Sequence, residues 1–151
     1  MGVNNVFRVG ICCLDILPQG HPEIGNWMHR VAREYGEYRY YKEALHLMQE
    51  TLTFSKKISS ENKELIADCM DAIAYYYSEL GDNNEAVKSQ QSTVLYVEKH
   101  FAKTHEYVRL ARRALIRHMQ KKIETTRRIG PELPPKMAEE SGDRFIYRRS
   151  R

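Results

Sequence analysis

The chain has 151 residues, a formal net charge of +4 and three cysteines, and 42% of its residues are hydrophobic. This length suits one domain with a sizeable core, and the composition is ordinary for a helical protein. No apolar run approaches the roughly 18–20 residues that a membrane span needs, so none is predicted.

Apolar residues recur with helical spacing along most of the chain. They predict an all-α fold of about six helices, near residues 3–17, 22–36, 40–57, 62–80, 84–100 and 104–128. We expect a helical domain over 1–128, followed by an extended tail over 129–151 that is rich in proline and basic residues.

The first helix, within a half-repeat at 2–20, has the apolar pattern of the second helices of the later units. In that register Val3, Val6 and Cys13 match Leu45, Met48 and Ser55. A second helix without its first helix leaves an apolar face for a partner or another copy of the chain, so self-association is one expectation. The alternative is that this segment simply covers the first full unit.

Two full units follow, over 21–62 and 63–104, and they align without a gap at an offset of 42 residues. Each carries large apolar, aliphatic, small and aromatic residues on one helical face, and then an alanine early in a second helix. The copies read Met28-x2-Val31-Ala32-x2-Tyr35 with Glu43-Ala44-Leu45, and Met70-x2-Ile73-Ala74-x2-Tyr77 with Glu85-Ala86-Val87. The alanines predict points where two helices cross closely.

This pattern resembles the tetratricopeptide repeat (TPR) family, over roughly residues 2–121. The 42-residue period and the His21-Pro22 opening are similar to the long repeats of kinesin light chain. The resemblance implies a solenoid of antiparallel helix hairpins that binds other proteins. The first unit departs from the pattern, since Arg39 stands where the second unit has Gly81 of a Gly-Asp turn.

A third, degraded copy supplies a capping helix over 105–128. Arg112 replaces the methionine and Met119 the tyrosine of the earlier units. We expect a terminal helix whose outer face is polar. Residues 103–128 hold nine basic and two acidic residues, a net charge of +7, whereas residues 1–102 carry −4.

This charge has two interpretations: a solvated cap, or a face that docks an acidic protein or, less favoured, nucleic acid. The candidate basic docking face consists of Lys121, Lys122, Arg127, Arg128, Arg148 and Arg149.

The TPR resemblance also implies a concave groove built from the first helix of each unit. The groove positions hold Asn26, His29, Arg30, Arg33, Asp68, Asp71, Tyr75, Ser78, Leu110, Arg113, Arg117 and Gln120. They lack the family's clamp for a C-terminal carboxylate. Asp68 and Asp71 either bind a peptide or are neutralised by Arg33 and Arg113 within the stack.

No catalytic or metal-binding motif is present, and we expect neither enzyme activity nor a cofactor. Cys12, Cys13 and Cys69 are predicted to be reduced apolar fillers, which indicates an intracellular protein, cytoplasmic or alternatively mitochondrial. The sequence therefore favours a noncatalytic scaffold that binds protein partners. The alternative is a small structural subunit of a large assembly, such as a mitochondrial complex or ribosome.

Overall fold

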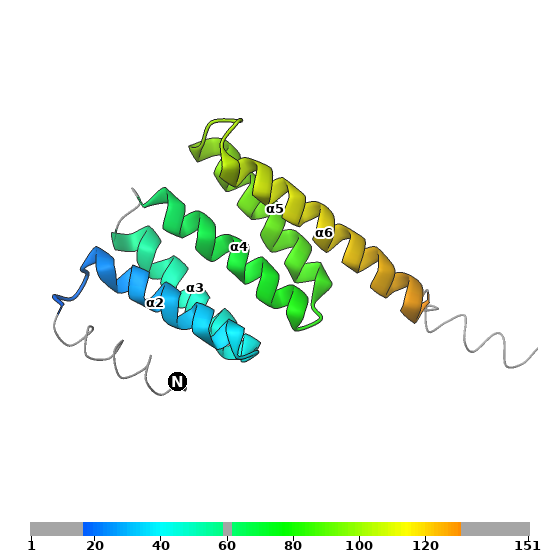
Figure 1. Ribbon diagram of the computed structural model, residues 1–151, viewed down its shortest axis with the longest axis horizontal. Coiled ribbons are helices and arrows are strands. Elements are labelled where there is room, and N and C mark those ends of the chain that lie inside the picture. Colours follow the sequence, from blue (N-terminus) through cyan, green and yellow to red (C-terminus); the bar gives the residue numbers. More distant parts are fainter. Residues whose placement is uncertain (1–16, 59–61, 131–151) are drawn as a thin grey trace, which may run out of the picture.

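The computed structural model describes residues 17–58 and 62–130, and every element in those ranges is a helix (Figure 1). The elements are α2 (Pro22–Glu37), α3 (Tyr41–Ile58), α4 (Lys63–Glu79), α5 (Asn83–His100) and α6 (Glu106–Ile129). These match five of the six predicted helices to within two residues at each end. The helix predicted at 3–17 and the tail from 131 lie outside the described residues, as do Cys12 and Cys13.

Side chains at the start of four helices accept backbone N–H groups that have no partner inside the helix. His21 and His105, two repeat lengths apart, use Nδ1 to accept the N–H of Glu23 and Tyr107, each at 3.2 Å. Asn62 and Asp82 cap α4 and α5 in the same way. The third unit therefore keeps the helix start of the first, although it lacks the proline.

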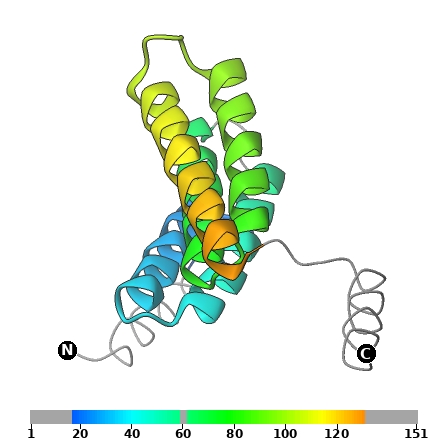
Figure 2. The same ribbon diagram turned by 90° about the vertical axis from the view of Figure 1, so that its right-hand side faces the viewer.

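The helices form a row in which each packs on the next (Figure 1). In addition α2 contacts α4 and α4 contacts α6, whereas α3 and α5 do not touch each other. The first helices of the units therefore make one continuous layer and the second helices lie behind it. Seen from the end of the row, α6 stands in front of the other helices (Figure 2).

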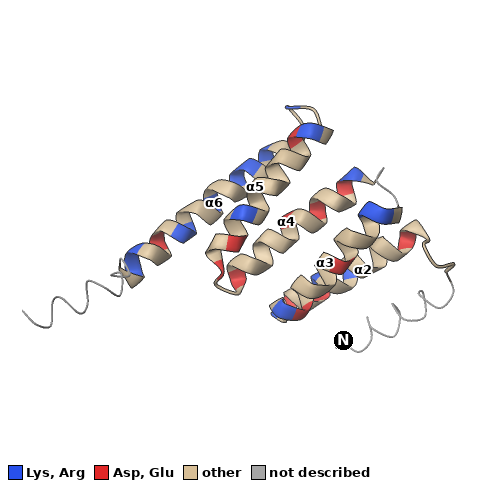
Figure 3. Ribbon diagram, turned by 180° about the vertical axis from the view of Figure 1, so that it is seen from behind, with Lys and Arg blue, Asp and Glu red and all other residues tan. Residues whose placement is uncertain are grey.

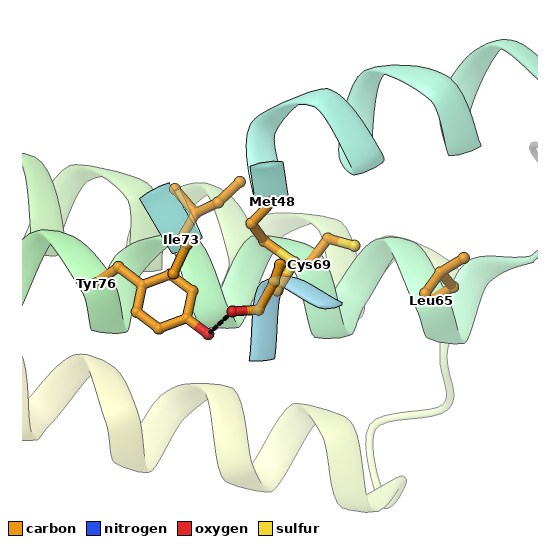
Figure 4. Packing of buried hydrophobic residues seen from close by; sticks show 7 residues of the cluster. Met48, Leu65, Cys69, Ile73 and Tyr76 are labelled. Carbon is orange, nitrogen blue, oxygen red and sulfur yellow. Dashed lines mark hydrogen bonds between the residues drawn. The ribbon is translucent and has the colours of Figure 1, made fainter. Parts of the chain in front are cut away.

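The repeated alanines lie at the tightest crossings. Ala32, Ala44, Ala74 and Ala86 are all 0% exposed. Larger side chains from neighbouring helices surround the first pair, and Figure 4 shows Met48, Cys69, Ile73 and Tyr76 in this cluster. The hydroxyl of Tyr76 donates to the carbonyl of Ala32 at 3.3 Å, which ties α4 to α2. The close crossings predicted from the small residues are thus confirmed.

The outer face of α6 is polar only in part, because exposed apolar side chains lie among its exposed charged residues, and this corrects the expectation of a polar face. Ile116, Met119 and Ile123 are 56%, 45% and 50% exposed. The positions equivalent to Ile116 in α2 and α4, Ala32 and Ala74, are fully buried, and no helix follows α6 in the described part of the chain. None of the described helices is both long and apolar enough to cross a bilayer.

Candidate functional site

A pocket of about 430 Å³ opens between α2 and α4, on the layer formed by the first helices. Five residues predicted for the groove line it: His29, Arg33, Asp68, Asp71 and Tyr75. Four more residues complete the wall and were not predicted: Gly36, Glu37, Ala72 and Tyr76. On α2, His29, Arg33 and Gly36 are spaced by four and three residues, and on α4, Asp68, Asp71 and Tyr75 by three and four, so each helix turns one face to the pocket.

Gly36 allows the two helices to approach at this pocket. A Cβ atom at this position would lie 2.7 Å from both Cε1 and the hydroxyl oxygen of Tyr76. The absent side chain leaves room for the Tyr76 ring, which is 4% exposed and forms the floor of the pocket. Burial raises the pKa of Tyr76 to about 12, so its hydroxyl stays protonated and remains a donor.

Asp68 is a half-buried carboxylate that forms no salt bridge with another residue of the described ranges. Burial raises its pKa, as do the charges of Asp71 and Glu64, while the Tyr107 hydroxyl and the Arg33 charge act in the opposite direction. Among the described residues, no ion pair joins Asp68 or Asp71 to Arg33 or Arg113. The Arg33 charge therefore favours the ionised form of Asp68 from a distance, without a direct ion pair.

The side-chain amide of a buried glutamine on α5 forms a hydrogen bond to the Asp71 carboxylate. Gln90 of α5 is 0% exposed, and its Nε2 donates to Asp71 Oδ1 at 2.8 Å and to the carbonyl of Ala111 at 3.1 Å. One side chain thus joins α5 to both α4 and α6. Gln90 occupies the register position of Met48 in the preceding unit, so a buried polar residue replacing an apolar one was the signal that sequence reasoning missed.

Two histidines lie near these carboxylates. Burial and the neighbouring Arg33 lower the pKa of His29, which keeps it neutral at pH 7. Burial also lowers the pKa of His118 on α6, although the charge of Asp71 opposes this. Arg33 is therefore the cationic residue that lines the pocket, opposite Asp68 and Asp71.

One exposed tyrosine, Tyr75, lines the pocket beside the carboxylates. Tyr75 is 46% exposed and lies edge-on to Tyr76, with ring centroids 5.6 Å apart, and edge-on to Tyr41 at 6.4 Å. Burial raises the pKa of Tyr75 above its ordinary value of 10. These contacts fix an exposed aromatic surface beside the carboxylates.

The remaining predicted groove residues lie elsewhere. Asn26 donates to Glu23 on its own helix at 3.2 Å, and the Arg30 guanidinium lies 4.7 Å from the centroid of the Trp27 ring. Arg113 and Arg117 are exposed on α6 and do not line the pocket. Three more predicted groove residues do not line the pocket either: Leu110 and Gln120 are exposed, and Ser78 is buried.

The residues of the predicted basic docking face do not act as one set. Lys121 Nζ donates to the carbonyl of Ser78 at 2.9 Å and lies 3.4 Å from Glu79 Oε1, so it helps to pack α6 on α4. Lys122 lines a separate hollow beside the turn between α4 and α5. Arg127 and Arg128 are exposed in the last turn of α6, where positive charge suits the helix dipole. Figure 3 shows basic residues along α6.

Arg148 and Arg149 of the predicted basic docking face lie outside the described residues.

Among the described residues, no cluster of histidine, cysteine, aspartate or glutamate is arranged to hold a metal ion. Cys69 is 0% exposed, and burial raises the pKa of its thiol to about 12, which suits an apolar filler and not a nucleophile. The arrangement at the pocket can bind charged or aromatic groups.

No protein-family model and no curated protein sequence matches the chain. Solved structures do match, and two of them are nearly identical TPR-like repeats attributed to a kinesin light chain of Podosopora anserina. A glutamine-to-methionine variant of those repeats has a TM-score of 0.69 and 20% identity over 81% of this chain. The second structure has a TM-score of 0.67 and 19% identity over 98% of this chain.

The chain spans 57% and 68% of the lengths of those two structures. At 19–20% sequence identity, the similarity to these structures shows a shared fold and nothing about function. Together with the two aligned units and the layer of first helices, it establishes that the chain has a TPR-like helical repeat fold.

Proposed function

We propose that the chain is a noncatalytic protein-interaction scaffold that binds an extended peptide segment of a partner between α2 and α4. The observation that carries the proposal is the pair Asp68 and Asp71 on one face of α4, in an open pocket and without an ion pair among the described residues. A basic side chain of the peptide would lie between these carboxylates.

Burial supports this role for Asp68. Its pKa is raised, so the folded protein holds the charged carboxylate at a cost in stability. A cationic ligand would relieve that cost, because an opposite charge close to a half-buried carboxylate favours the ionised form. Gln90 fixes Asp71 beside it, and the exposed ring of Tyr75 offers a surface for the aliphatic part of a lysine or arginine.

The test is binding of labelled, unstructured peptides that differ only in the central side chain. Peptides with a central arginine or lysine should bind the full chain, and those with glutamate or serine should bind at least tenfold more weakly. Asp68→Asn and Asp71→Asn should each remove this preference, because an amide carries no charge. Glu50→Gln, at an exposed position on α3, is the matched control and should leave binding unchanged. Equal affinity for all peptides would contradict the proposal.

The alternative function, a structural subunit of a large assembly, is favoured by one observation. The outer face of α6 exposes apolar side chains that a free scaffold would be expected to cover. Sedimentation of the native protein from its source separates the two functions: a permanent subunit should migrate entirely with a large complex, and a scaffold should also occur free.

A further inference from the structure

The outer face of α6 differs from the same face of α2 and α4. Ala32 and Ala74 are 0% exposed because α3 and α5 cross over them, whereas Ile116, the residue 42 positions after Ala74, is 56% exposed. No described helix takes the corresponding place over α6, which is the foremost helix when the row is seen from its end (Figure 2).

The exposed residues form a continuous stripe. Ile116, Met119 and Ile123 are spaced by three and four residues, which aligns them along one side of the helix, and the half-buried Leu115 lies at the edge of the stripe. Single exposed apolar residues are normal on a protein surface, but a stripe of this kind is typical of a face that receives another helix.

Basic residues flank the stripe on both sides. Helical spacing places Arg113 and Arg127 along one edge and Lys122 along the other. Arg112 lies at its N-terminal end, where its Nε and Nη2 donate to Glu98 Oε1 on α5 at 2.9 and 2.6 Å. The two acidic residues of α6, Glu106 and Glu124, lie about 20° beyond Arg113 on the same side. Basic residues outnumber them beside the stripe, so its surroundings are positive on balance.

The positive charge around the stripe determines which kind of partner can bind it. Two copies of α6 packed face to face would bring together two helices that each hold eight basic and two acidic residues, a net charge of +6, which disfavours a symmetric pair. A helix with acidic residues beside its apolar face is complementary in both respects. Because Ile116 occupies the place of an alanine, such a helix would pack at a wider separation than α3 or α5.

We propose that this face of α6 binds an amphipathic helix of a partner protein, with apolar residues over Ile116, Met119 and Ile123 and glutamate or aspartate on its flanks. This surface is separate from the pocket between α2 and α4. Binding here does not require a peptide in that pocket, and the two sites would allow one chain to hold two partner segments.

The test uses two synthetic amphipathic peptides with the same leucine stripe, one flanked by glutamates and the other by lysines, and measures fluorescence anisotropy with the full chain. The glutamate peptide should bind at least tenfold more tightly, and added salt should reduce the difference. Ile116→Glu and Met119→Glu should each weaken its binding at least tenfold. Leu95→Glu, at a position 69% exposed on α5, is the control and should leave binding unchanged.

Other outcomes would overturn the proposal. Equal binding of both peptides would mean nonspecific apolar adhesion. If Ile116→Glu melts at a lower temperature than the wild type, the chain covers this face itself. If the wild type is an oligomer and Ile116→Glu is a monomer, a second copy of the chain covers the face. The Asp68→Asn variant should bind the glutamate peptide as the wild type does, so failure at the pocket and failure at α6 are distinguishable.

Discussion

Arg39 and Gly81 lie 42 residues apart, at the same place in successive units, and both have a positive φ, 63° and 88°. Their turns also match in hydrogen bonding. The Arg39 N–H donates to the Gly36 carbonyl at 3.0 Å, and the Gly81 N–H to the Ser78 carbonyl at 3.2 Å. The first unit therefore keeps the turn of the second without its glycine, and an arginine adopts a backbone conformation that glycine adopts more easily.

Arg39→Gly should therefore stabilise the fold by about 0.5–1 kcal/mol, because it removes the strain of a Cβ atom in the left-handed region. Chemical denaturation measures this. Arg39→Ala keeps the Cβ atom and is the control, which should not show the gain. Gly81→Ala should cost a similar amount from backbone strain alone, since no atom lies within 4 Å of the added Cβ. A neutral Arg39→Gly would mean that the arginine side chain compensates for the strain.

Ala74→Leu should destabilise the fold by about 1–3 kcal/mol, because Ala74 is fully buried where α4 and α5 cross, and extra methyl groups there force the helices apart. Ala32→Leu should do the same between α2 and α3. The matched control is Ile116→Leu at the equivalent but exposed position of α6, which should change stability by less than about 0.5 kcal/mol. Thermal melting of the three variants checks this, and equal melting temperatures would contradict the assigned helix crossings.

The fold could be predicted because the same packing requirement, small residues where helices cross, appears in both full repeat units of the sequence. The alanines and tyrosines on one face recur at an offset of 42 residues, and every such alanine is at a close crossing in the structure. Local pattern sufficed for these positions, since the spacing of three and four residues along a helix already defines which face is covered.

The site could be predicted only in part, because contacts between helices have no local signature. Gln90 reaches Asp71 across 19 residues, and Lys121 reaches the Ser78 carbonyl across 43. The polar outer face expected for α6 was only partly right, for a different reason. That expectation rested on how helical repeats end, with a polar terminal helix, whereas here the basic residues lie beside the stripe of Ile116 and Met119 and do not replace it.

Gly36→Ala should destabilise the fold, although alanine is favoured over glycine inside a helix by about 1 kcal/mol. The reason is the 2.7 Å contact that the new Cβ would make with the Tyr76 ring. In a Tyr76→Leu background the same change should become neutral or stabilising. A Tyr76→Phe background is the control and should keep the penalty, because the ring carbons remain. A stabilising Gly36→Ala in the wild type would mean that α2 and α4 can separate at no cost.

Asp68→Asn should raise stability at pH 7 while it removes binding of basic peptides. The pKa of Asp68 is raised in the fold above its ordinary 3.8, mainly by burial. A raised pKa contributes stability that is complete below pH 3.8 and is lost as pH rises through the folded value, so the charged form is the less favourable one at pH 7. Asparagine keeps an acceptor for Tyr107 without the charge.

The free energy of unfolding, measured by denaturant between pH 4.5 and 8, should therefore differ most between Asp68→Asn and the wild type at neutral pH, and the gap should narrow as pH falls. Glu50→Gln, at an exposed position on α3, should show no such trend. If Asp68→Asn is less stable than the wild type at pH 7, the carboxylate holds the stack together through interactions that outweigh its burial. In that case its position in the pocket reflects stability and not peptide binding. A gain in stability together with a loss of peptide binding is the outcome that only a binding role explains.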